Sequence, residues 1–381
     1  MKLGIVTHSV IKGDGQGRVN YEIAQEAIRR GHHVTLLASQ VAPELQQSEQ
    51  VNWVPISVKQ WPTELLRNLI FAFTSADWLH KNRTQFDLIK INGAITRASG
   101  DVNAVHFVHS SWLKFTSSKA QTNSAKTTQS RRFLYNFYQW LYTVLNASWE
   151  KEAFRRARVV VAVSSRVAED LQAIGVAPEK IRVIVNGVDL QEFSPGNIPR
   201  SQWGLPEGVP LALFAGDIRI SRKNLDTVLK ALVQVPDLHL AVAGITEGSP
   251  YLQLAEDLGL STRVHFLGLR RDVPELMKAV DFLVFPSRYE PFGLVVIEAM
   301  ASGLPVITAS ATGAADLLTP ESGIVVADSD DVEALAKAMF LLGSDRHLRQ
   351  NMGQAARTIA EQHSWTNMAQ HYVDLFEELK Q

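Results

Sequence analysis

The sequence predicts an α/β protein built from two doubly wound, mainly parallel sheets that face each other. The length of 381 residues is more than one compact core usually holds, which favours two lobes of similar size. Apolar residues make up 46% and charged residues 20%, a balance typical of folded chains that excludes a mainly disordered one. Short apolar runs alternate with helical patterns in both halves, as expected for βαβ units.

The first series of strands and helices occupies the N-terminal half. The apolar run 3–7 predicts a strand, the glycine-rich stretch 13–17 a loop, and the pattern over 18–30 a helix. The stretch 114–132 is rich in Ser, Thr, Gln and Lys without an acidic residue, which predicts a loop. The stretch 131–158 predicts a helix with eight aromatic residues. Further strands are predicted at 33–37, 87–91, 103–108 and 159–163.

A second series follows the turn-rich stretch 193–199, which predicts a linker. Ligands of such folds bind at the carboxyl ends of parallel strands, so we expect the ligand in a cleft between the lobes. Strands of this series are predicted at 211–214, 238–242, 264–266, 282–285, 305–307 and 323–326.

Composition excludes several classes of protein. The chain has no cysteine, so a disulfide framework, a thiolate metal site and a cysteine nucleophile are excluded, and we expect a cytoplasmic protein. No signal peptide is expected, and no apolar run reaches the roughly 18 residues of a membrane span. Residues 1–185 carry 23 Lys and Arg against 14 Asp and Glu, whereas 186–381 carry 15 against 25. The halves are therefore expected to have different partners, and no nucleic acid is expected among them.

The glycine-rich loop is the first candidate for ligand binding. Gly13, Gly15 and Gly17 follow a strand and open a helix, where free N–H groups and the helix dipole favour a phosphate. The dinucleotide fingerprint needs glycine at position 18, where Arg18 stands, and no acidic residue ends the next strand. A dehydrogenase is therefore disfavoured, and a flexible turn or a backbone contact to phosphate or sugar remains open.

The strongest signal lies in residues 287–303. Glu290 follows a strand in a loop, Gly293 and Leu294 begin a helix, and Glu298 lies one turn inside it. The amides at a helix N-terminus can bind a diphosphate, and a carboxylate can accept hydrogen bonds from both hydroxyls of a ribose. The alternative is a capping residue and a surface helix residue.

A pair of cations follows another strand. The strand ends at Gly216, and Arg222 and Lys223 lie in the loop before the next helix. Fixed cations at a strand end lower the barrier for departure of a nucleoside diphosphate, because negative charge develops on that leaving group. A solvated basic loop is the alternative.

These motifs, with 157–164 and 182–189, resemble the retaining glycosyltransferases of family 4, which have the GT-B fold. The resemblance covers nearly the whole chain. It implies two facing Rossmann-like domains, 1–188 for the acceptor and 189–365 for the nucleotide sugar. A final helix at about 366–381 is implied to cross back to the first domain.

The resemblance also implies roles for individual residues. Glu298 resembles the carboxylate that holds the ribose, and Glu290 the group that fixes the donor sugar and diphosphate. Lys223 resembles a phosphate cation, and its partner is Arg222 or Arg219 because Asp217 stands where the family has arginine. His109 resembles a histidine of the donor-sugar pocket, although a structural histidine is an alternative, and His106 is expected to face the other side. The other donor-binding candidates are Gly15, Gly17, Gly216, Arg270, Phe292, Gly293 and Leu294.

The implied reaction moves a hexose from a nucleotide sugar to an acceptor hydroxyl by front-face attack with retention. The resemblance to this family suggests UDP-glucose as the donor and a polysaccharide or a lipid-linked sugar as the acceptor. A nucleotide-sugar 2-epimerase and a non-catalytic binding protein are the alternatives. No cofactor or metal is expected, because Asp328 and Asp330 are interpreted as helix-capping acids. Trp112, Lys114, Phe115 and the aromatic helix suggest contact with an anionic membrane at its cytoplasmic face, although the aromatic residues could equally be the buried side of that helix.

Overall fold

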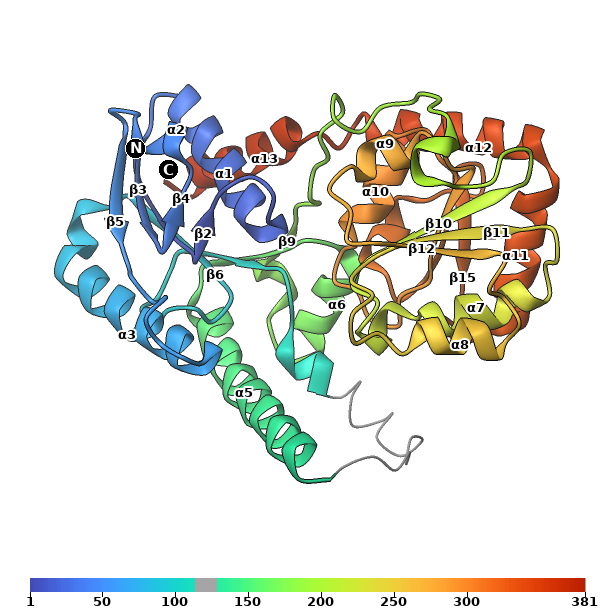
Figure 1. The fold of residues 1–381 in the computed structure, drawn as a ribbon. Coiled ribbons are helices and arrows are strands. Elements are labelled where there is room, and N and C mark those ends of the chain that lie inside the picture. Colours follow the sequence, from blue (N-terminus) through green and yellow to red (C-terminus); the bar gives the residue numbers. More distant parts are fainter. Residues whose placement is uncertain (114–128, 381) are drawn as a thin grey trace. The chain divides into compact units, whose positions relative to one another are not determined.

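The computed structural model describes the backbone of residues 1–113 and 129–380, and the side chains of these residues except 129–142. The chain divides into two compact units (Figure 1). Unit 1 comprises Met1–Asn186 and Trp365–Gln381, and unit 2 comprises Gly187–Ser364. Each unit has one parallel sheet with helices on both faces, which confirms the predicted fold class of two parallel-sheet α/β domains.

The sheet of unit 1 has seven strands in the order β5-β3-β1-β6-β7-β8-β9. Its described pairings are parallel, and the strand order reverses between β1 and β6, where ligands bind in such sheets. The strands are β1 (Lys2–Val6), β3 (His33–Ala38), β5 (Val51–Pro55), β6 (Leu88–Asn92), β7 (Val102–Val105), β8 (Val159–Ala162) and β9 (Ile181–Val183).

Helices cover both faces of this sheet, and the terminal helix α13 packs against α1. Helix α1 begins at Gly15, three residues before the predicted start, because the Asp14 carboxylate caps it. The helices are α1 (Gly15–Arg29), α2 (Pro43–Gln46), α3 (Glu64–Asn82), α5 (Gln129–Arg156), α6 (Ser165–Ala173) and α13 (Trp365–Lys380), with 3-10 turns η1 (Arg83–Gln85) and η2 (Pro178–Lys180) and a two-stranded ladder of β2 (Ser9–Val10) and β4 (Gln40–Val41).

The sheet of unit 2 has six strands in the order β12-β11-β10-β13-β14-β15, and again the described pairings are parallel. Its four central strands are almost entirely buried, as expected for a sheet with helices on both faces. The strands are β10 (Leu211–Ala215), β11 (His239–Ala243), β12 (Val264–Gly268), β13 (Phe282–Phe285), β14 (Val306–Ala309) and β15 (Gly323–Val326). The helices are α7 (Leu225–Val233), α8 (Tyr251–Asp257), α9 (Val273–Met277), α10 (Leu294–Ala301), α11 (Val332–Ser344) and α12 (Arg346–Ala360), with η3 (Arg200–Trp203), η4 (Ser221–Lys223) and η5 (Gly313–Leu317).

Candidate active site

Two neighbouring strands of unit 2 bring the predicted acidic and basic residues together. Strands β10 and β13 are adjacent and parallel, so their carboxyl ends lie at the same edge of the sheet. The loop after β10 carries Arg222 and Lys223, and the loop after β13 carries Glu290. One carboxylate oxygen, Oε2 of Glu290, accepts hydrogen bonds from both cations. These three residues form the charge cluster.

The charge cluster is compact and partly shielded from water. Nη1 of Arg222 lies 3.0 Å from Oε2 of Glu290, and Nζ of Lys223 is in close contact with the same oxygen. The side chain of Lys223 is 14% exposed and that of Glu290 12%. Burial lowers the pKa of Lys223, while the Glu290 charge acts in the opposite direction and the Arg222 charge adds to the lowering. Nζ of Lys223 also lies 4.9 Å from the centre of the Phe285 ring.

Asn224 fixes the loop that presents Lys223. Its φ of 69° is the one positive value outside glycine in the described chain, and asparagine tolerates this left-handed conformation. Its Nδ2 donates to the carbonyl oxygens of Pro286 at 2.9 Å and Ser329 at 2.5 Å, and its Oδ1 accepts from Thr227 at 2.6 Å. The asparagine therefore combines a left-handed backbone conformation with three side-chain hydrogen bonds that hold the loop.

Arg288 links the loop after β13, on which it lies, to the loop after β10. Its guanidinium contacts Asp226 at 2.7 Å and Asp330 at 2.6 Å, and its backbone N–H donates to the carbonyl of Arg222 at 2.8 Å. The predicted helix-capping role of Asp328 and Asp330 is therefore wrong. The cap of α11 is Asp331, whose carboxylate accepts from the N–H of Ala334, so the helix begins later than predicted.

The N-terminus of α10 lies beside Glu290. Gly293 precedes the helix with a φ of 91°, and a Cβ there would approach Glu290 Cγ to 3.2 Å and Thr312 Cγ2 to 3.0 Å, so this position requires glycine. The first N–H groups of a helix have no acceptor within the helix. The N–H of Val296 donates to the carbonyl of Gly293 at 3.0 Å, which leaves the N–H groups of Leu294 and Val295 for an anion. Buried Phe292 precedes them, and its carbonyl accepts from the N–H of Ala314.

Glu298 lies about one turn further along α10 and is half-buried. Burial raises the pKa of Glu298 to about 7, and the negative charge of Glu192 acts in the same direction. Its carboxylate makes no hydrogen bond to any described residue, so it can accept hydrogen bonds from hydroxyl groups of a ligand.

The remaining unit 2 candidates lie around the charge cluster or apart from it. Gly216 follows the last residue of β10, and a Cβ there would lie 3.8 Å from the Lys223 side chain. Arg219 is half-exposed and contacts Asp217 at 2.7 Å, which lowers the pKa of that carboxyl. Arg270 follows β12 and contacts Asp272, so the structure does not bring it to the charge cluster. Of the two candidate arginines, Arg222 is the one paired with Glu290.

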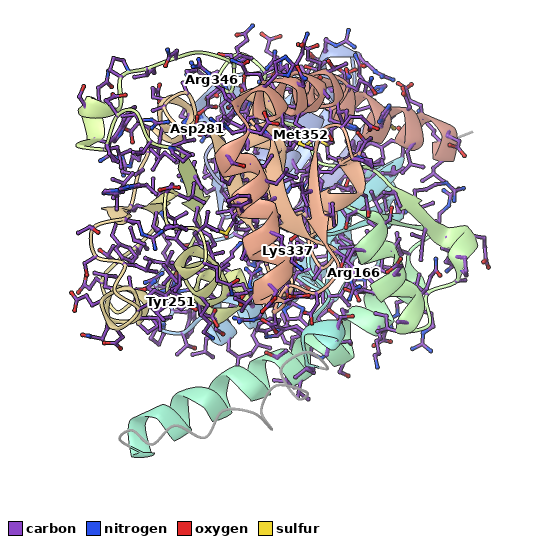
Figure 2. The ribbon with its side chains drawn as sticks, turned by 90° about the vertical axis from the view of Figure 1, so that its right-hand side faces the viewer. Arg166, Tyr251, Asp281, Lys337, Arg346 and Met352 are labelled. Atoms are coloured by element: carbon purple, nitrogen blue, oxygen red, sulfur yellow. The ribbon has the colours of Figure 1, made fainter. Side chains whose placement is uncertain are left out.

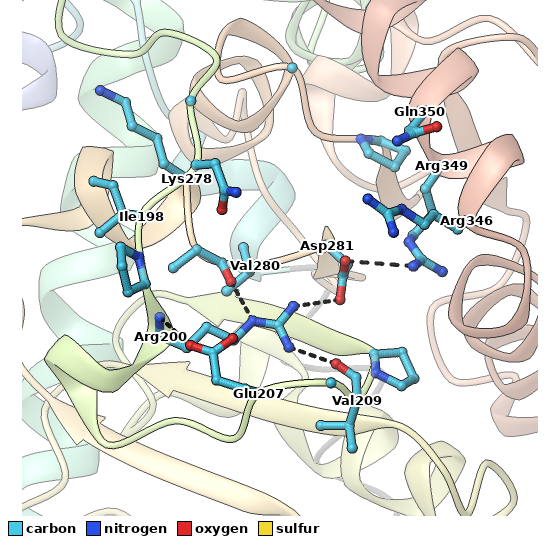
Figure 3. A pocket seen from close by; sticks show the side chains of 18 of the residues that line it. Ile198, Arg200, Glu207, Val209, Lys278, Val280, Asp281, Arg346, Arg349 and Gln350 are labelled. Carbon is cyan, nitrogen blue, oxygen red and sulfur yellow. Dashed lines mark hydrogen bonds and ion pairs between the residues drawn. The ribbon is translucent and has the colours of Figure 1, made fainter.

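A cavity of about 870 Å³ lies at the other end of the unit 2 strands, where β10, β13 and β14 begin. Figure 2 shows Asp281 and Arg346, which line it, at one end of the unit and Tyr251 at the other. One of its cations, Arg200, binds Asp281 and the carbonyls of Val209 and Ala279 (Figure 3). These contacts satisfy the Arg200 guanidinium within the protein. We therefore do not assign the active site to this cavity. Among the described residues, no three His, Asp or Glu side chains come together as a metal site would require.

His109 of unit 1 is tied to a buried carboxylate. Its backbone N–H and Nδ1 lie 2.9 and 3.1 Å from Oε2 of Glu150, which is on α5 and 1% exposed. The N–H of Ser110 donates to the other oxygen at 2.8 Å. No local pattern pointed to Glu150, because 41 residues separate it from His109.

The prediction that His106 faces away from His109 is wrong. Strand β7 ends at Val105, so the alternation of a strand does not extend to these residues. Both histidines line a cavity of about 200 Å³ in unit 1. Burial lowers the pKa of His106, and the charge of Lys90 adds to this effect.

The glycine-rich loop is closely packed at the start of α1. The N–H of Gly17 donates to Asp14 at 3.1 Å, and the Ser9 hydroxyl donates to the same carboxylate at 2.6 Å. A Cβ on Gly17 would lie 2.8 Å from that oxygen, so glycine is required there for packing. The structure therefore pairs the Gly17 amide with an internal acid, while Gly15 forms the first residue of the helix.

Part of the predicted membrane-contacting surface lies outside the described residues, namely Lys114, Phe115 and the side chains of the aromatic residues 133–142. Trp112 is half-buried, and its ring centre lies 6.1 Å from that of Phe107. In the part of the chain that is described, no helix combines the length and apolar character needed to span a membrane.

Comparisons with known proteins give two matching family models. The model for Glycosyltransferase Family 4 matches residues 13–192, and that for Glycosyl transferases group 1 matches residues 197–359. A D-inositol 3-phosphate glycosyltransferase of Corynebacterium kroppenstedtii is 32% identical over 53% of this chain and 49% of the relative. An uncharacterised glycosyltransferase of Methanocaldococcus jannaschii is 30% identical over 57% of this chain and 59% of the relative. The chain thus spans about half the length of the curated relatives it matches.

Solved structures are similar over almost the whole chain. Sucrose-phosphate synthase from Thermosynechococcus elongatus has a TM-score of 0.79 at 21% identity and covers 99% of this chain and 98% of its own. Anabaena HepE, solved with UDP and glucose, has a TM-score of 0.71 at 21% identity, with 99% of each chain covered. These similarities show the GT-B fold that the sequence predicted. With the two family matches, which together cover most of the sequence, they lead to one conclusion: the chain belongs to the family 4, group 1 glycosyltransferases.

Proposed function

We propose that this chain transfers a hexose from a nucleotide sugar to an acceptor hydroxyl with retention of the anomeric configuration and without a metal ion. The observation that carries the proposal is the charge cluster beside α10. It places two partly buried cations, one carboxylate and a helix N-terminus at the carboxyl ends of neighbouring strands. A diphosphate needs such positive groups.

The chemistry follows from where charge develops. When the bond between the anomeric carbon and the diphosphate breaks, negative charge grows on the leaving oxygen, and Arg222 and Lys223 stabilise it. The acceptor oxygen attacks from the same face, and its proton passes to the leaving phosphate oxygen. The new glycosidic bond replaces the broken one, and no covalent enzyme intermediate is required. The protein contributes position and fixed charge.

Glu298 supplies the second part of the donor site. In this proposal its ionised carboxylate accepts hydrogen bonds from both ribose hydroxyls. Since burial raises its pKa to about 7, nucleotide affinity should increase as the pH rises through 7 and level off about one pH unit higher. UDP-glucose is the first donor to test, because a structural neighbour has been solved with it. The acceptor is proposed to be a polysaccharide or lipid-linked sugar, at the cytoplasmic face of an anionic membrane.

The test begins with binding. A thermal-shift panel of UDP-glucose and other UDP-, ADP- and GDP-sugars identifies the donor, because a ligand that binds only the folded state raises its stability. Lys223→Ala should then reduce turnover of that donor by about 10²- to 10³-fold, as for loss of one strong electrostatic group. Lys230→Ala removes a lysine from the exposed surface of α7 and should leave turnover unchanged. Equal turnover in Lys223→Ala and the wild type would disprove the assigned role.

Product analysis separates the alternatives. A transferase yields a new glycoside only when an acceptor is present, whereas a 2-epimerase converts the donor alone into an isomeric sugar. A chain that binds nucleotide sugar but forms neither product would be a binding protein. Turnover that persists in excess EDTA would support metal independence, and loss of turnover that Mg²⁺ restores would contradict it.

A further inference from the structure

The cavity of about 870 Å³ in unit 2 is separate from the proposed donor site. Strand β13 lies between them, because Asp281 of the cavity precedes this strand and Glu290 of the charge cluster follows it. The strand has four residues, which at about 3.3 Å each span roughly 13 Å. The volume is in the range of small-molecule sites, about 300–1,000 Å³. A ligand in this cavity would therefore leave the donor site free.

Positive charge gathers in this cavity although unit 2 as a whole is acidic. Residues 187–364 carry 14 Lys and Arg against 22 Asp and Glu, a net charge of −8. The described residues that line the cavity include four cations and two carboxylates, a net charge of +2. The cations are Arg200, Lys278, Arg346 and Arg349, and the carboxylates are Glu207 and Asp281.

Both carboxylates and two of the cations are engaged within the protein. Asp281 accepts from Arg200 at 2.8 Å and lies 3.6 Å from Arg349. The guanidinium of Arg349 also donates to the carbonyl of Leu342 at 2.6 Å. Glu207 accepts from the backbone N–H of Arg200 at 2.8 Å. These residues build the wall of the cavity, and their charges largely offset one another.

The other two cations, Lys278 and Arg346, are open to a ligand. Neither side chain makes a hydrogen bond or an ion pair with a described residue, and both residues are at least partly exposed. The stem of Lys278 packs beside the linker, since a Cβ on Gly196 would lie 2.9 Å from its Cδ. Figure 3 shows Lys278 on one side of the cavity and Arg346 with Gln350 on the other. A ligand can therefore be held from two sides.

Gln350 adds a neutral donor on the side of Arg346. The two residues are four positions apart near the start of α12, so their side chains share one face of the helix. The side-chain amide of Gln350 has no hydrogen-bond partner among the described residues. Its NH₂ group can therefore donate to the same ligand as the guanidinium.

These free donors favour a phosphate group. A guanidinium matches phosphate oxygens with two parallel N–H groups, and charge-assisted hydrogen bonds are roughly twice as strong as neutral ones. A phosphate monoester carries a charge of roughly −1.5 to −2 at pH 7, close to the opposite of the net charge of the lining. A single phosphate would fill only part of the cavity, and the apolar residues Ile198 and Pro305 also line it. The cavity thus has room for an organic group attached to the phosphate.

We infer that this cavity binds a phosphate group, with Arg346 and Gln350 on one side and Lys278 on the other. The phosphate belongs to a small molecule that is bound in addition to the nucleotide sugar. This site is built from residues that the proposed transfer reaction does not use, so its existence does not depend on the proposed function.

The experiment is calorimetric titration of the full chain with inorganic phosphate and with glucose 6-phosphate. Both probes should bind the wild type saturably. Arg346→Gln and Lys278→Gln should each weaken binding by about tenfold, as for loss of one charge-assisted hydrogen bond, and the double variant should show no measurable binding. Affinity should also fall as NaCl increases, because both cations reach solvent. Tighter binding of glucose 6-phosphate than of phosphate would identify an organic phosphate as the ligand, and equal affinity would identify free phosphate.

Lys337→Gln is the matched control. Lys337 is exposed on α11, is not among the residues that line the cavity, and lies apart from Arg346 in Figure 2. The substitution removes the same charge from the same unit, and phosphate affinity should stay at the wild-type value. Melting temperatures without phosphate should also equal that of the wild type in Arg346→Gln and Lys278→Gln, since neither side chain bonds to a described residue.

Lys223→Ala separates this inference from the proposed function. It removes a cation of the charge cluster, so it should reduce turnover of nucleotide sugar and leave phosphate binding in the cavity unchanged. Phosphate binding that is lost in Lys223→Ala but kept in the double variant would place the phosphate at the charge cluster and overturn the inference. Absence of binding to the wild type, or an equal loss in Lys337→Gln, would also overturn it. Phosphate binding that depends on Arg346 in a chain that turns over no nucleotide sugar would refute the proposed function alone.

Discussion

Replacement of Glu298 by glutamine should stabilise unit 2 at alkaline pH. The carboxylate is half-buried on α10 and makes no hydrogen bond to a described residue. Burial raises its pKa from 4.5 to about 7, and Glu192 contributes in the same direction. The folded state therefore favours the protonated form. Between pH 4.5 and 7 the unfolded chain releases this proton while the folded chain retains it, so stability falls as the pH rises.

The size of the effect follows from the displacement of the pKa. Each unit corresponds to about 1.4 kcal/mol, so the displacement from 4.5 to about 7 corresponds to roughly 3 kcal/mol once both states are ionised. The residual exposure of the side chain reduces this to on the order of 2 kcal/mol. Glutamine keeps the shape and carries no charge. Glu298→Gln should thus equal the wild type near pH 4.5 and be about 2 kcal/mol more stable at pH 8.

Native-state hydrogen exchange with mass spectrometry measures this, because peptides from 187–364 report on unit 2 separately. Glu192→Gln is the control: it leaves the Glu298 carboxyl in place and removes the neighbouring charge, so the gain at pH 8 should be smaller. In the same variants UDP affinity should fall for Glu298→Gln only. A stability difference that is the same at pH 5 and pH 8, or a loss at pH 8, would refute the reasoning.

Three further predictions concern the backbone and the buried lysine. Asn224→Ala should be about 1 kcal/mol less stable than Asn224→Gly in urea unfolding, because alanine tolerates the φ of 69° poorly, and equal values would contradict this. Gly244→Ala places a Cβ 2.2 Å from the carbonyl oxygen of Gly216 and should cost about 1–3 kcal/mol and reduce turnover, as kinetics at matched temperature would show. Burial lowers the pKa of Lys90 to about 7, so between pH 7 and 10 the unfolded chain binds more protons than the folded chain. The free energy of unfolding of the wild type should therefore rise by on the order of a few kcal/mol over that range. Lys90→Met should lack this gain in denaturant titrations of both proteins, and parallel curves would count against it.

The fold was predictable wherever strands are fully buried. Strands β10 and β13 are apolar at every position, so short apolar runs identify them. Strand β5 was missed because it is the edge strand of its sheet and its residues are only partly buried or exposed. Helix α3 and strand β9 were missed for a similar reason, since exposed apolar residues such as Phe73 and Val183 blur their patterns.

The candidate site was predictable as a set of loops, whereas the contacts between its residues were not. Sequence placed Lys223 and Glu290 after strands, and parallel topology brings such loops together. That both cations bind one oxygen of Glu290 depends on contacts across 67 and 68 residues, which no local pattern encodes. Lys90 does leave a signal in the sequence, because it is a lysine between two isoleucines of a short, mainly apolar run.

Glu290 has an effect on the cluster beyond any contact with a sugar. Burial and the charge of Arg222 both lower the pKa of Lys223, and Glu290 is the largest influence that opposes them. Without this carboxylate, two cations in a partly buried loop would favour loss of a proton from the lysine. With it, the cluster carries one net positive charge beside the N-terminus of α10. In the proposed function a bound diphosphate adds negative charge in the same place and supports both cations further. The acid that reduces the attraction for anions then also keeps the lysine charged.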